Sequence, residues 1–194
     1  MAKYIAEFLG TFALALAVSL SITGKFPVPT PVVAALTLGV CVYTLGAISG
    51  THINPAITIG LAVIRKISPA EAGGYLAAQF AGAGAAMAVA GFLGKAAAVG
   101  AMDSGPVFAG EFLGTFLLAT GVASVVHGKA SGPAAGLTIG GSLLVGLTVA
   151  AASSNAVLNP AVALAIGSLS PAYVLAPIVG SAAAMALYSF LARE

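Results

Sequence analysis

The chain has 194 residues, of which 60% are hydrophobic and 6% are charged. Its 7 Lys or Arg and 5 Asp or Glu cannot form the charged shell of a soluble domain, in which about a quarter of the residues are charged. A net charge of +2 without a basic cluster excludes nucleic acid as a partner. A single Cys and no zinc-ligand or phosphate-loop motif predict neither metal nor cofactor. The composition therefore predicts an integral membrane protein surrounded by lipid.

The predicted membrane spans are apolar intervals of about 20 residues that are free, or nearly free, of charge. Two shorter remainders, Asn54–Arg65 and Asn159–Ser168, are too short to cross a bilayer. The six spans, in chain order, are Tyr4–Gly24, Val32–Ser49, Pro69–Phe92, Val107–His127, Pro133–Ser153 and Pro171–Ala192. The sequence therefore predicts an all-α membrane protein with six transmembrane helices and two additional short segments.

The basic residues predict how these spans are oriented. Cytoplasmic loops carry an excess of Lys and Arg, and the loops of this chain follow this rule when the N-terminus lies inside. The cytoplasmic set is then Lys3, Arg65, Lys66, Lys129 and Arg193, and the outer set is Lys25 and Lys95. We therefore expect a multi-pass protein of the plasma membrane with both termini in the cytoplasm.

An internal repeat divides the chain. The segment Ala6–Phe12 recurs as Gly110–Phe116, an offset of 104 residues, with six of seven residues identical. Two further pairs follow, Asn54-Pro55-Ala56 with Asn159-Pro160-Ala161 at 105 and Ser68-Pro69-Ala70 with Ser170-Pro171-Ala172 at 102. These pairs predict a duplicated domain.

The single domain of residues 1–194 thus consists of repeat 1, about 1–95, and repeat 2, about 105–194. Each repeat contains three full spans. Because three is odd, the second repeat must enter the membrane from the opposite face, which makes the repeats inverted and brings related segments together at mid-membrane.

The paired Asn-Pro-Ala motifs predict two re-entrant half-helices. Asn is a preferred N-cap and Pro is favoured at the first helical position, so Asn54-Pro55 and Asn159-Pro160 each begin a helix of about ten residues. Irregular backbone at membrane depth is tolerated only where it is buried in protein or lines a wet cavity. The candidate pore-lining residues before the two motifs are Gly50, Thr51, His52, Ile53, Asn155, Ala156, Val157 and Leu158.

These features resemble the aquaporin, or major intrinsic protein, family over essentially the whole chain. The family has six helices, two half-helices and twin Asn-Pro-Ala motifs on inverted repeats. The matching positions are Glu7, Gly10-Thr11-Phe12, Ile48 through Ala56, Glu111, His127-Gly128, Asn155 through Ala161 and Pro177 through Gly180. The resemblance implies a homotetramer in which every monomer has its own pore.

A passive conduit follows from the opposed half-helices. Each helix N-terminus carries about half a positive charge, so two of them at the channel midpoint disfavour cations and protons but not neutral solutes. Asn54 and Asn159 can accept backbone N–H bonds through the side-chain carbonyl and donate an amide N–H to a passing oxygen, or they can serve as caps alone. Passage needs no nucleophile and no energy coupling, so we do not expect an enzyme.

Glu7 and Glu111 lie inside predicted spans, where ionisable groups are costly and often functional. The resemblance implies that Glu7 and Glu111 accept hydrogen bonds from the pore loops and act as scaffolds, with direct solute contact as the alternative. It also implies that His52 lines the cytoplasmic half of the pore, whereas a bracing role within the loop is the alternative.

The four positions that form the narrow filter in the family read Ala34, Leu147, Ala156 and Val162 here. Typical water channels carry an aromatic residue, a His, a small residue and an Arg in these places. This chain is therefore an atypical member without the filter Arg, whose position is occupied by Val162. Four small or medium apolar side chains predict a wide filter that admits water and small uncharged solutes such as glycerol or urea.

The same residues leave other functions open. Leu147 and Val162 could form a hydrophobic collar that gates by dewetting. A strict water channel, a secondary transporter with inverted repeats and an ion-leaky channel are further alternatives.

Overall fold

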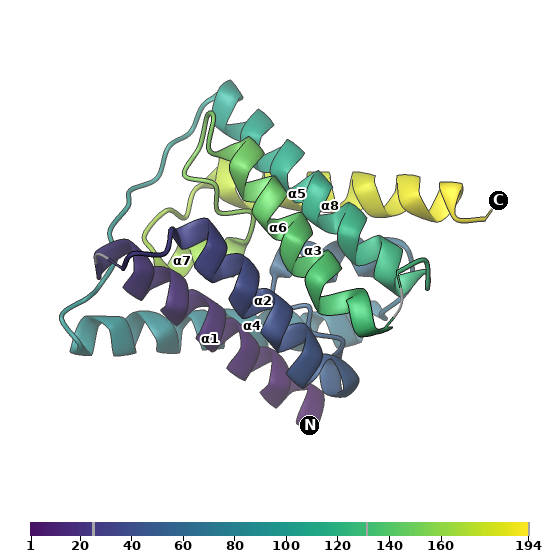
Figure 1. Cartoon of the computed structure of the whole chain (residues 1–194), viewed down its shortest axis with the longest axis horizontal. Helices are drawn as coiled ribbons and strands as arrows, with labels where there is room; N and C mark the ends of the chain where they lie inside the picture. The colour runs from purple at the N-terminus through teal and green to yellow at the C-terminus, as the bar shows by residue number, and fades with distance from the viewer. Residues whose placement is uncertain (25, 131, 194) are drawn as a thin grey trace.

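The computed structural model describes residues 1–24, 26–130 and 132–193, and the regular secondary structure in this part of the chain is all helix, with no strand (Figure 1). Lys25, which we predict to lie outside, falls beyond the described residues. The long helices are α1 (Ala2–Thr23), α2 (Thr30–Ser49), α4 (Pro69–Phe92), α5 (Gly105–Val126), α6 (Ala135–Ala150, preceded by the 3-10 turn η1, Gly132–Ala134) and α8 (Pro171–Leu191). The short helices are α3 (Pro55–Val63) and α7 (Pro160–Ala165).

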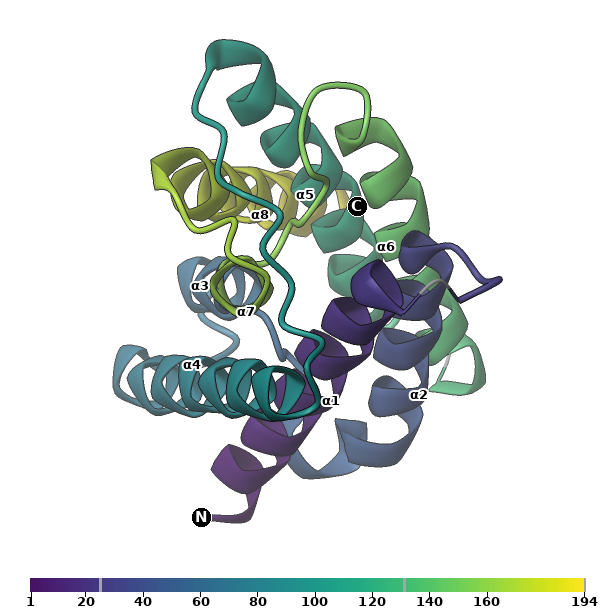
Figure 2. The same ribbon diagram turned by 90° about the vertical axis from the view of Figure 1, so that its left-hand side faces the viewer.

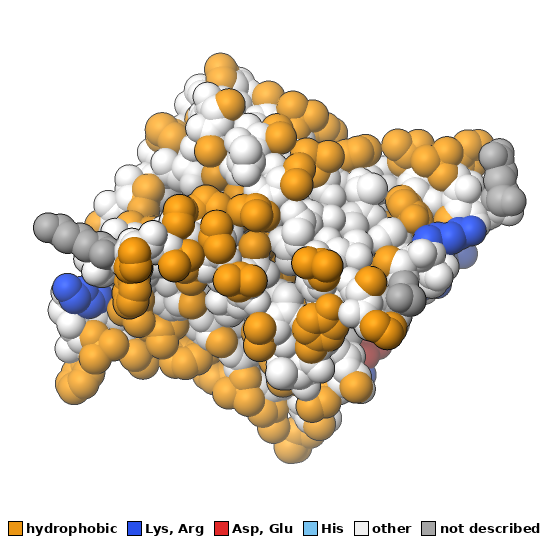
Figure 3. Space-filling model, viewed as in Figure 1, with side chains coloured by type: hydrophobic (Ala, Val, Ile, Leu, Met, Phe, Trp, Pro, Cys, Tyr) orange, Lys and Arg blue, Asp and Glu red, His pale blue; other side chains and the backbone are white. Residues whose placement is uncertain are grey.

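The six long helices confirm the six predicted spans. Each is long and apolar enough to cross a membrane, and its ends differ from the predicted ones by no more than a few residues. Figure 3 shows hydrophobic side chains covering much of one face of the molecule, with Lys and Arg side chains towards its two ends. An apolar belt between charged ends is the surface expected of a protein surrounded by lipid.

Local sequence explains where several helices begin. Ser68 precedes Pro69 and its hydroxyl accepts a hydrogen bond from the backbone N–H of Glu71 at 3.2 Å. Ser104 caps α5 in the same way through the N–H of Val107 at 3.3 Å. A Ser cap followed by an early Pro satisfies one of the unpaired N–H groups at a helix start and presets the backbone for the first turn.

The helices pack as two similar halves that exchange their short helices. In the first half α1 packs against α2 and α4, in the second α5 packs against α6 and α8, and α2 against α6 joins the halves. The short helices cross over, because α3 packs against α8 and α7 against α4. Figure 2 shows α3 and α7 in the middle of the bundle, enclosed by the long helices.

Two close helix crossings show which residues of α4 and α8 are equivalent in the two repeats. A Cβ added at Gly82 of α4 would lie 2.4 Å from the carbonyl oxygen of Phe8, and one added at Gly180 of α8 would lie 2.4 Å from that of Phe112. These glycines therefore occupy equivalent places, although they are 98 residues apart. The offset of 102 between Ser68-Pro69-Ala70 and Ser170-Pro171-Ala172 aligns only the helix starts. In space, Gln79 is equivalent to Pro177.

Candidate pore

The two half-helices begin at the Asn-Pro motifs. The side-chain Oδ1 of Asn54 accepts a hydrogen bond from the N–H of Ala56 at 2.9 Å. The Oδ1 of Asn159 accepts from Ala161 at 3.0 Å and from Val162 at 3.3 Å. Pro55 and Pro160 occupy the first helical positions, where a missing N–H costs nothing. The Pro and Ala residues of both motifs are buried, so each asparagine is held by a packed helix start. These residues are Pro55, Ala56, Pro160 and Ala161.

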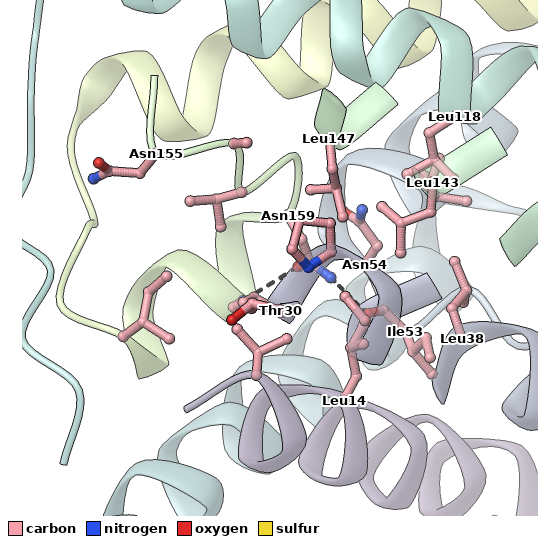
Figure 4. A pocket seen from close by; sticks show the side chains of 18 of the residues that line it. Leu14, Thr30, Leu38, Ile53, Asn54, Leu118, Leu143, Leu147, Asn155 and Asn159 are labelled. Atoms are coloured by element: carbon pink, nitrogen blue, oxygen red, sulfur yellow. Dashed lines mark hydrogen bonds between the residues drawn. The ribbon is translucent and has the colours of Figure 1, made fainter. Parts of the chain in front are cut away.

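The amide groups of the two asparagines also tie the halves together. Asn54 Nδ2 donates to the carbonyl oxygen of Leu158 at 2.9 Å, and Asn159 Nδ2 donates to that of Ile53 at 3.0 Å. Figure 4 shows Asn54 and Asn159 next to each other at the centre of the pocket. Because a side-chain amide carries two hydrogens, one N–H of each asparagine is engaged within the protein and one is left for a ligand.

A buried carboxylate stands behind each loop. Glu7 Oε1 accepts from the Ser49 hydroxyl at 2.7 Å and the His52 N–H at 2.9 Å. Its Oε2 accepts from the Ile53 N–H at 2.7 Å and Gln79 Nε2 at 2.8 Å. Glu7 is fully buried. Four donors on two oxygens match the acceptor capacity of an ionised carboxylate.

The second carboxylate repeats this arrangement. Glu111 Oε1 accepts from the Ser154 hydroxyl at 2.7 Å and the Val157 N–H at 2.9 Å, and Oε2 accepts from the Leu158 N–H at 2.7 Å. Glu111 is also fully buried. Neither glutamate lines the cavity described below, so the structure places both behind the loops and away from a solute path.

The loops share an unusual backbone. Thr51 and Ile53 have φ angles of 51° and 37°, and Ala156 and Leu158 have 51° and 57°. Non-glycine residues with positive φ are uncommon, and each costs on the order of 1–3 kcal/mol. The hydrogen bonds to Glu7 and Glu111 oppose this cost. The same two positions are left-handed in both loops, at an offset of 105 residues.

This backbone turns carbonyl groups away from the carboxylates. In a trans peptide the N–H and the preceding C=O point in opposite directions. Because the N–H groups of His52 and Ile53 face Glu7, the carbonyls of Thr51 and His52 face away from it. The carbonyls of Ala156 and Val157 likewise face away from Glu111. Each loop therefore presents successive carbonyl oxygens on its side opposite the scaffold.

A cavity of about 290 Å³ lies between the long helices and is lined by both loops (Figure 4). It contains all four predicted filter residues, Ala34, Leu147, Ala156 and Val162. The loop residues and asparagines on its lining are Thr51, His52, Ile53, Asn54, Asn155, Val157 and Asn159. The structure thus brings the two motifs and the filter positions onto one continuous surface.

Two predicted pore-lining residues do not contribute to this surface. Gly50 ends α2 with a φ of 82° and lies outside the lining. Leu158 is fully buried, and its side chain approaches the backbone at Gly114 and Gly146 while its carbonyl accepts from Asn54. Leu158 therefore packs behind the loop.

Beyond the predicted filter and loop residues, much of the lining is aliphatic and was not predicted from the motifs. Leu14, Leu38 and Leu143 line the same cavity as the two asparagines (Figure 4). Further apolar lining residues are Val18, Ile57, Leu118, Val122 and Ile139. Apolar residues in a membrane span look alike whether they face lipid or a pore, so hydropathy could not distinguish them.

The sequence motifs also did not predict a network of polar side chains behind the first loop. Gln79 Nε2 donates to Thr58 Oγ1 at 2.9 Å in addition to Glu7, and Thr58 Oγ1 lies 3.2 Å from His52 Nδ1. Tyr75 donates its hydroxyl to the Ser49 carbonyl at 2.7 Å. A glutamine in the middle of an apolar span is the one signal that could have indicated this network.

Comparison with known proteins identifies the family. The family model described as "Major intrinsic protein" matches residues 1–188. A probable aquaporin, AqpM, of Archaeoglobus fulgidus is 36% identical over 82% of this chain and 74% of its own length. A glycerol uptake facilitator protein-like 6 of Lactiplantibacillus plantarum is 39% identical over 67% of each chain.

The fold agrees with that of a solved structure. The X-ray structure of the aquaglyceroporin from Plasmodium falciparum covers 99% of this chain and 95% of its own, with a TM-score of 0.67 and 21% identity. Six apolar helices and a family model over nearly the whole chain make this a multi-pass membrane protein. The chain belongs to the major intrinsic protein family, whose members are passive channels and not enzymes.

Proposed function

We propose that the chain conducts water and small uncharged solutes, such as glycerol or urea, through one pore in each monomer. The observation that supports this most strongly is the cavity lining, which Ala34, Leu147, Ala156 and Val162 share with the two asparagines. None of these four side chains is aromatic or charged. They leave more room than an aromatic and an arginine would, so a solute larger than water can enter.

The polar contacts along this path come from a few fixed groups. The remaining amide N–H of Asn54 and of Asn159 can donate to a hydroxyl or water oxygen, and the loop carbonyls can accept from it. A linear polyol suits such a surface, because its hydroxyls follow the polar groups and its carbon chain contacts the leucines. The relatives named as aquaporin and as glycerol facilitator support both solutes.

Exclusion of ions rests on the half-helices in this proposal. The N-termini of α3 and α7 each direct a partial positive charge towards the asparagines. Val162 contributes no charge where the family resemblance implies an Arg. The half-helices, together with aliphatic side chains that offer a cation no oxygen ligand, therefore oppose the passage of cations. The flux test also measures ion leak.

The aliphatic lining also supports one alternative state of the same pore. Leu14, Leu38, Leu143 and Leu147 line the same cavity as the asparagines, and an apolar constriction can exclude water by dewetting. A protein closed in this way passes neither water nor glycerol. A strict water channel passes water alone, and a secondary transporter passes solute only in proportion to an ion gradient.

We also propose the assembly and the orientation. The family resemblance supports a homotetramer with a pore in every subunit, located in the plasma membrane. Lys3 forms an ion pair with Glu71, which joins the N-terminus to the start of α4 on one side of the bundle. With the basic residues inside, this side and both termini are cytoplasmic.

Stopped-flow light scattering on proteoliposomes tests the proposed function. Water and glycerol permeabilities are compared with those of empty vesicles and of an Asn54→Asp/Asn159→Asp variant, in which the amide donors are lost. We expect both permeabilities to exceed the vesicle background by about tenfold and to be insensitive to proton and sodium gradients. Permeability to neither solute, or flux that follows an ion gradient, would overturn the proposal.

A further inference from the structure

The ends of α3 and α5 lie beside the last turns of α8. A Cβ added at Gly60, near the end of α3, would lie 2.9 Å from the Met185 sulfur of α8. His127 follows α5, and its Nε2 lies 2.9 Å from the Ser189 hydroxyl. The ring centroids of His127 and Tyr188 are 5.9 Å apart. The residues that follow α3 and α5 therefore meet on one side of the molecule.

Basic side chains gather where these helices end. Arg65 and Lys66 follow α3, Lys129 follows α5, and all three are exposed. Burial lowers the pKa of His127, and so do the positive charges of Lys66 and Lys129. Figure 3 shows Lys and Arg side chains at the end of the molecule where α8 ends. We define Arg65, Lys66 and Lys129 as the basic cluster.

Arg65 occupies a backbone position that favours glycine. The helices α3, α4, α5 and α7 end in the same turn, in which an N–H donates to the carbonyl five residues earlier at 2.8 or 2.9 Å. The residue before that N–H is left-handed, and in three turns it is Gly94, Gly128 or Gly167, with φ between 66° and 73°. After α3 it is Arg65, with a φ of 59°. Because a non-glycine residue is strained there, the arginine points to a use for its charge.

The helix dipole does not account for this arginine. A cation near a helix C-terminus interacts favourably with the carbonyl groups that end the helix. In three of the four turns the residue that donates the N–H supplies this cation, namely Lys66, Lys95 and Lys129. Arg65 is therefore a second cation at the end of α3.

The acidic side chains in the described part of the chain are engaged away from the basic cluster. Their partners are Lys3 for Glu71, the pore loops for Glu7 and Glu111, and the start of α8 for Asp103. Arg193 is left out of the cluster because Glu194 follows it in the sequence. The cluster thus presents three positive charges that no described acidic side chain neutralises.

Exposed apolar surface adjoins these charges. Leu187, Phe190 and Leu191 on the last turns of α8 are 49%, 63% and 55% exposed, and Val63 at the end of α3 is 54% exposed. An anion with hydrocarbon chains can contact both the charges and this surface. A soluble anion can contact the charges alone.

From this arrangement we propose that the basic cluster binds the headgroup phosphate of an acidic phospholipid, whose acyl chains lie against the end of α8. The inference goes beyond the proposed function and does not depend on it. Lys and Arg residues beside a membrane attract anionic lipids, and the planar guanidinium of arginine pairs two N–H groups with phosphate oxygens. In the proposed orientation this lipid belongs to the cytoplasmic leaflet.

Lipid binding to the purified protein tests the proposal. Delipidated protein in detergent is titrated with phosphatidylglycerol or with phosphatidylcholine, and bound lipid is measured by native mass spectrometry. The variants are Arg65→Gly, Lys66→Gln, Lys129→Gln and the triple combination. Arg65→Gly removes the charge and relieves the strained backbone, so its Tm should equal or exceed that of the wild type. Lys95→Gln is the matched control, because Lys95 occupies the same position as Lys66 and Lys129 in the turn after α4.

We expect the wild type to bind phosphatidylglycerol at least about tenfold more tightly than phosphatidylcholine. Each substitution in the cluster should weaken phosphatidylglycerol binding about fivefold, whereas Arg65→Lys and Lys95→Gln should change it by less than about twofold.

Equal binding of the two lipids by the wild type, or unchanged binding by the triple variant, overturns the proposal. An equal loss in Lys95→Gln also overturns it, because overall charge would then explain the binding. Complete displacement of phosphatidylglycerol by inorganic phosphate overturns the lipid as the occupant in favour of a soluble anion. None of these outcomes involves solute flux, so failure of this inference is distinguishable from failure of the proposed function.

Discussion

The two pore loops have the same backbone conformation but differ in the side chains that support them. Both have left-handed residues at equivalent positions, a serine hydroxyl on a glutamate and two loop N–H groups on the same carboxylate. Behind the first loop a polar chain links Glu7, Gln79, Thr58 and His52. The second loop has Val157 in the position of His52.

The difference shows which side chains are needed to hold the loop backbone in both halves. Ala163 and Pro177 stand where the first half has Thr58 and Gln79, so the second half lacks this polar chain. Despite that, its loop has the same shape. The carboxylate is therefore what sets the loop backbone in both halves, and the additional polar chain sets the position of His52 in one half only.

Removing a scaffold carboxylate should have the largest effect. Glu7→Leu leaves four buried donors without an acceptor and Glu111→Leu leaves three, and each orphaned group costs about 1–3 kcal/mol. We expect Glu7→Leu to lower the Tm in detergent by about 10 °C or more, with Glu111→Leu somewhat less affected. Both variants should lose conduction.

Leu113→Ala is the control for these variants, because Leu113 is half exposed on the outer face of the same helix as Glu111. Its Tm should stay close to that of the wild type. If Glu7→Leu and Glu111→Leu kept the wild-type Tm and full conduction, the carboxylates would not be what holds the loops.

Removing one asparagine should have an intermediate effect that is nearly equal in the two halves. Asn54→Ala and Asn159→Ala each remove a helix cap and one bond between the halves, together about 2 kcal/mol. The fall in Tm should be about 5 °C for either variant. A large fall for one and none for the other would show that the two motifs are not equivalent supports.

Changes in the polar chain of the first half should have the smallest effect. Thr58→Val removes the hydroxyl that receives Gln79 Nε2 and faces His52, at a cost of about 1 kcal/mol. We expect a Tm lower by a few degrees and a reduced water permeability with the pore still open. Thr58→Ser keeps the hydroxyl and removes only a methyl group, and an identical drop in water permeability there would remove the special role of the chain.

The sequence predicted the parts of the structure that depend on neighbouring residues. Asn-Pro at 54 and 159 marked the starts of both half-helices, and the charge-free intervals marked the six spans. The resemblance supplied the four filter positions, and all of them line the cavity. These features are set by capping, by the fixed φ of proline and by hydropathy, which are local properties.

Contacts between distant segments could not be predicted in this way. The amide of Asn54 reaches the Leu158 carbonyl across the repeat, and the Val99 N–H, between the repeats, reaches the Ile166 carbonyl. The register of α4 and α8 follows from the close approach of Gly82 and Gly180 to α1 and α5 and not from their starting motifs. Such contacts depend on how helices cross.

The central claim is that four apolar side chains make the filter wide enough for a solute larger than water. Its most direct test is the ratio of glycerol to water permeability for wild type and Val162→Arg in the same proteoliposomes, with equal protein per vesicle. We expect the arginine to lower glycerol permeability by about tenfold and water permeability by much less, so that the ratio falls. An equal effect on both solutes, or an unchanged ratio, would contradict the claim that these four positions set the width.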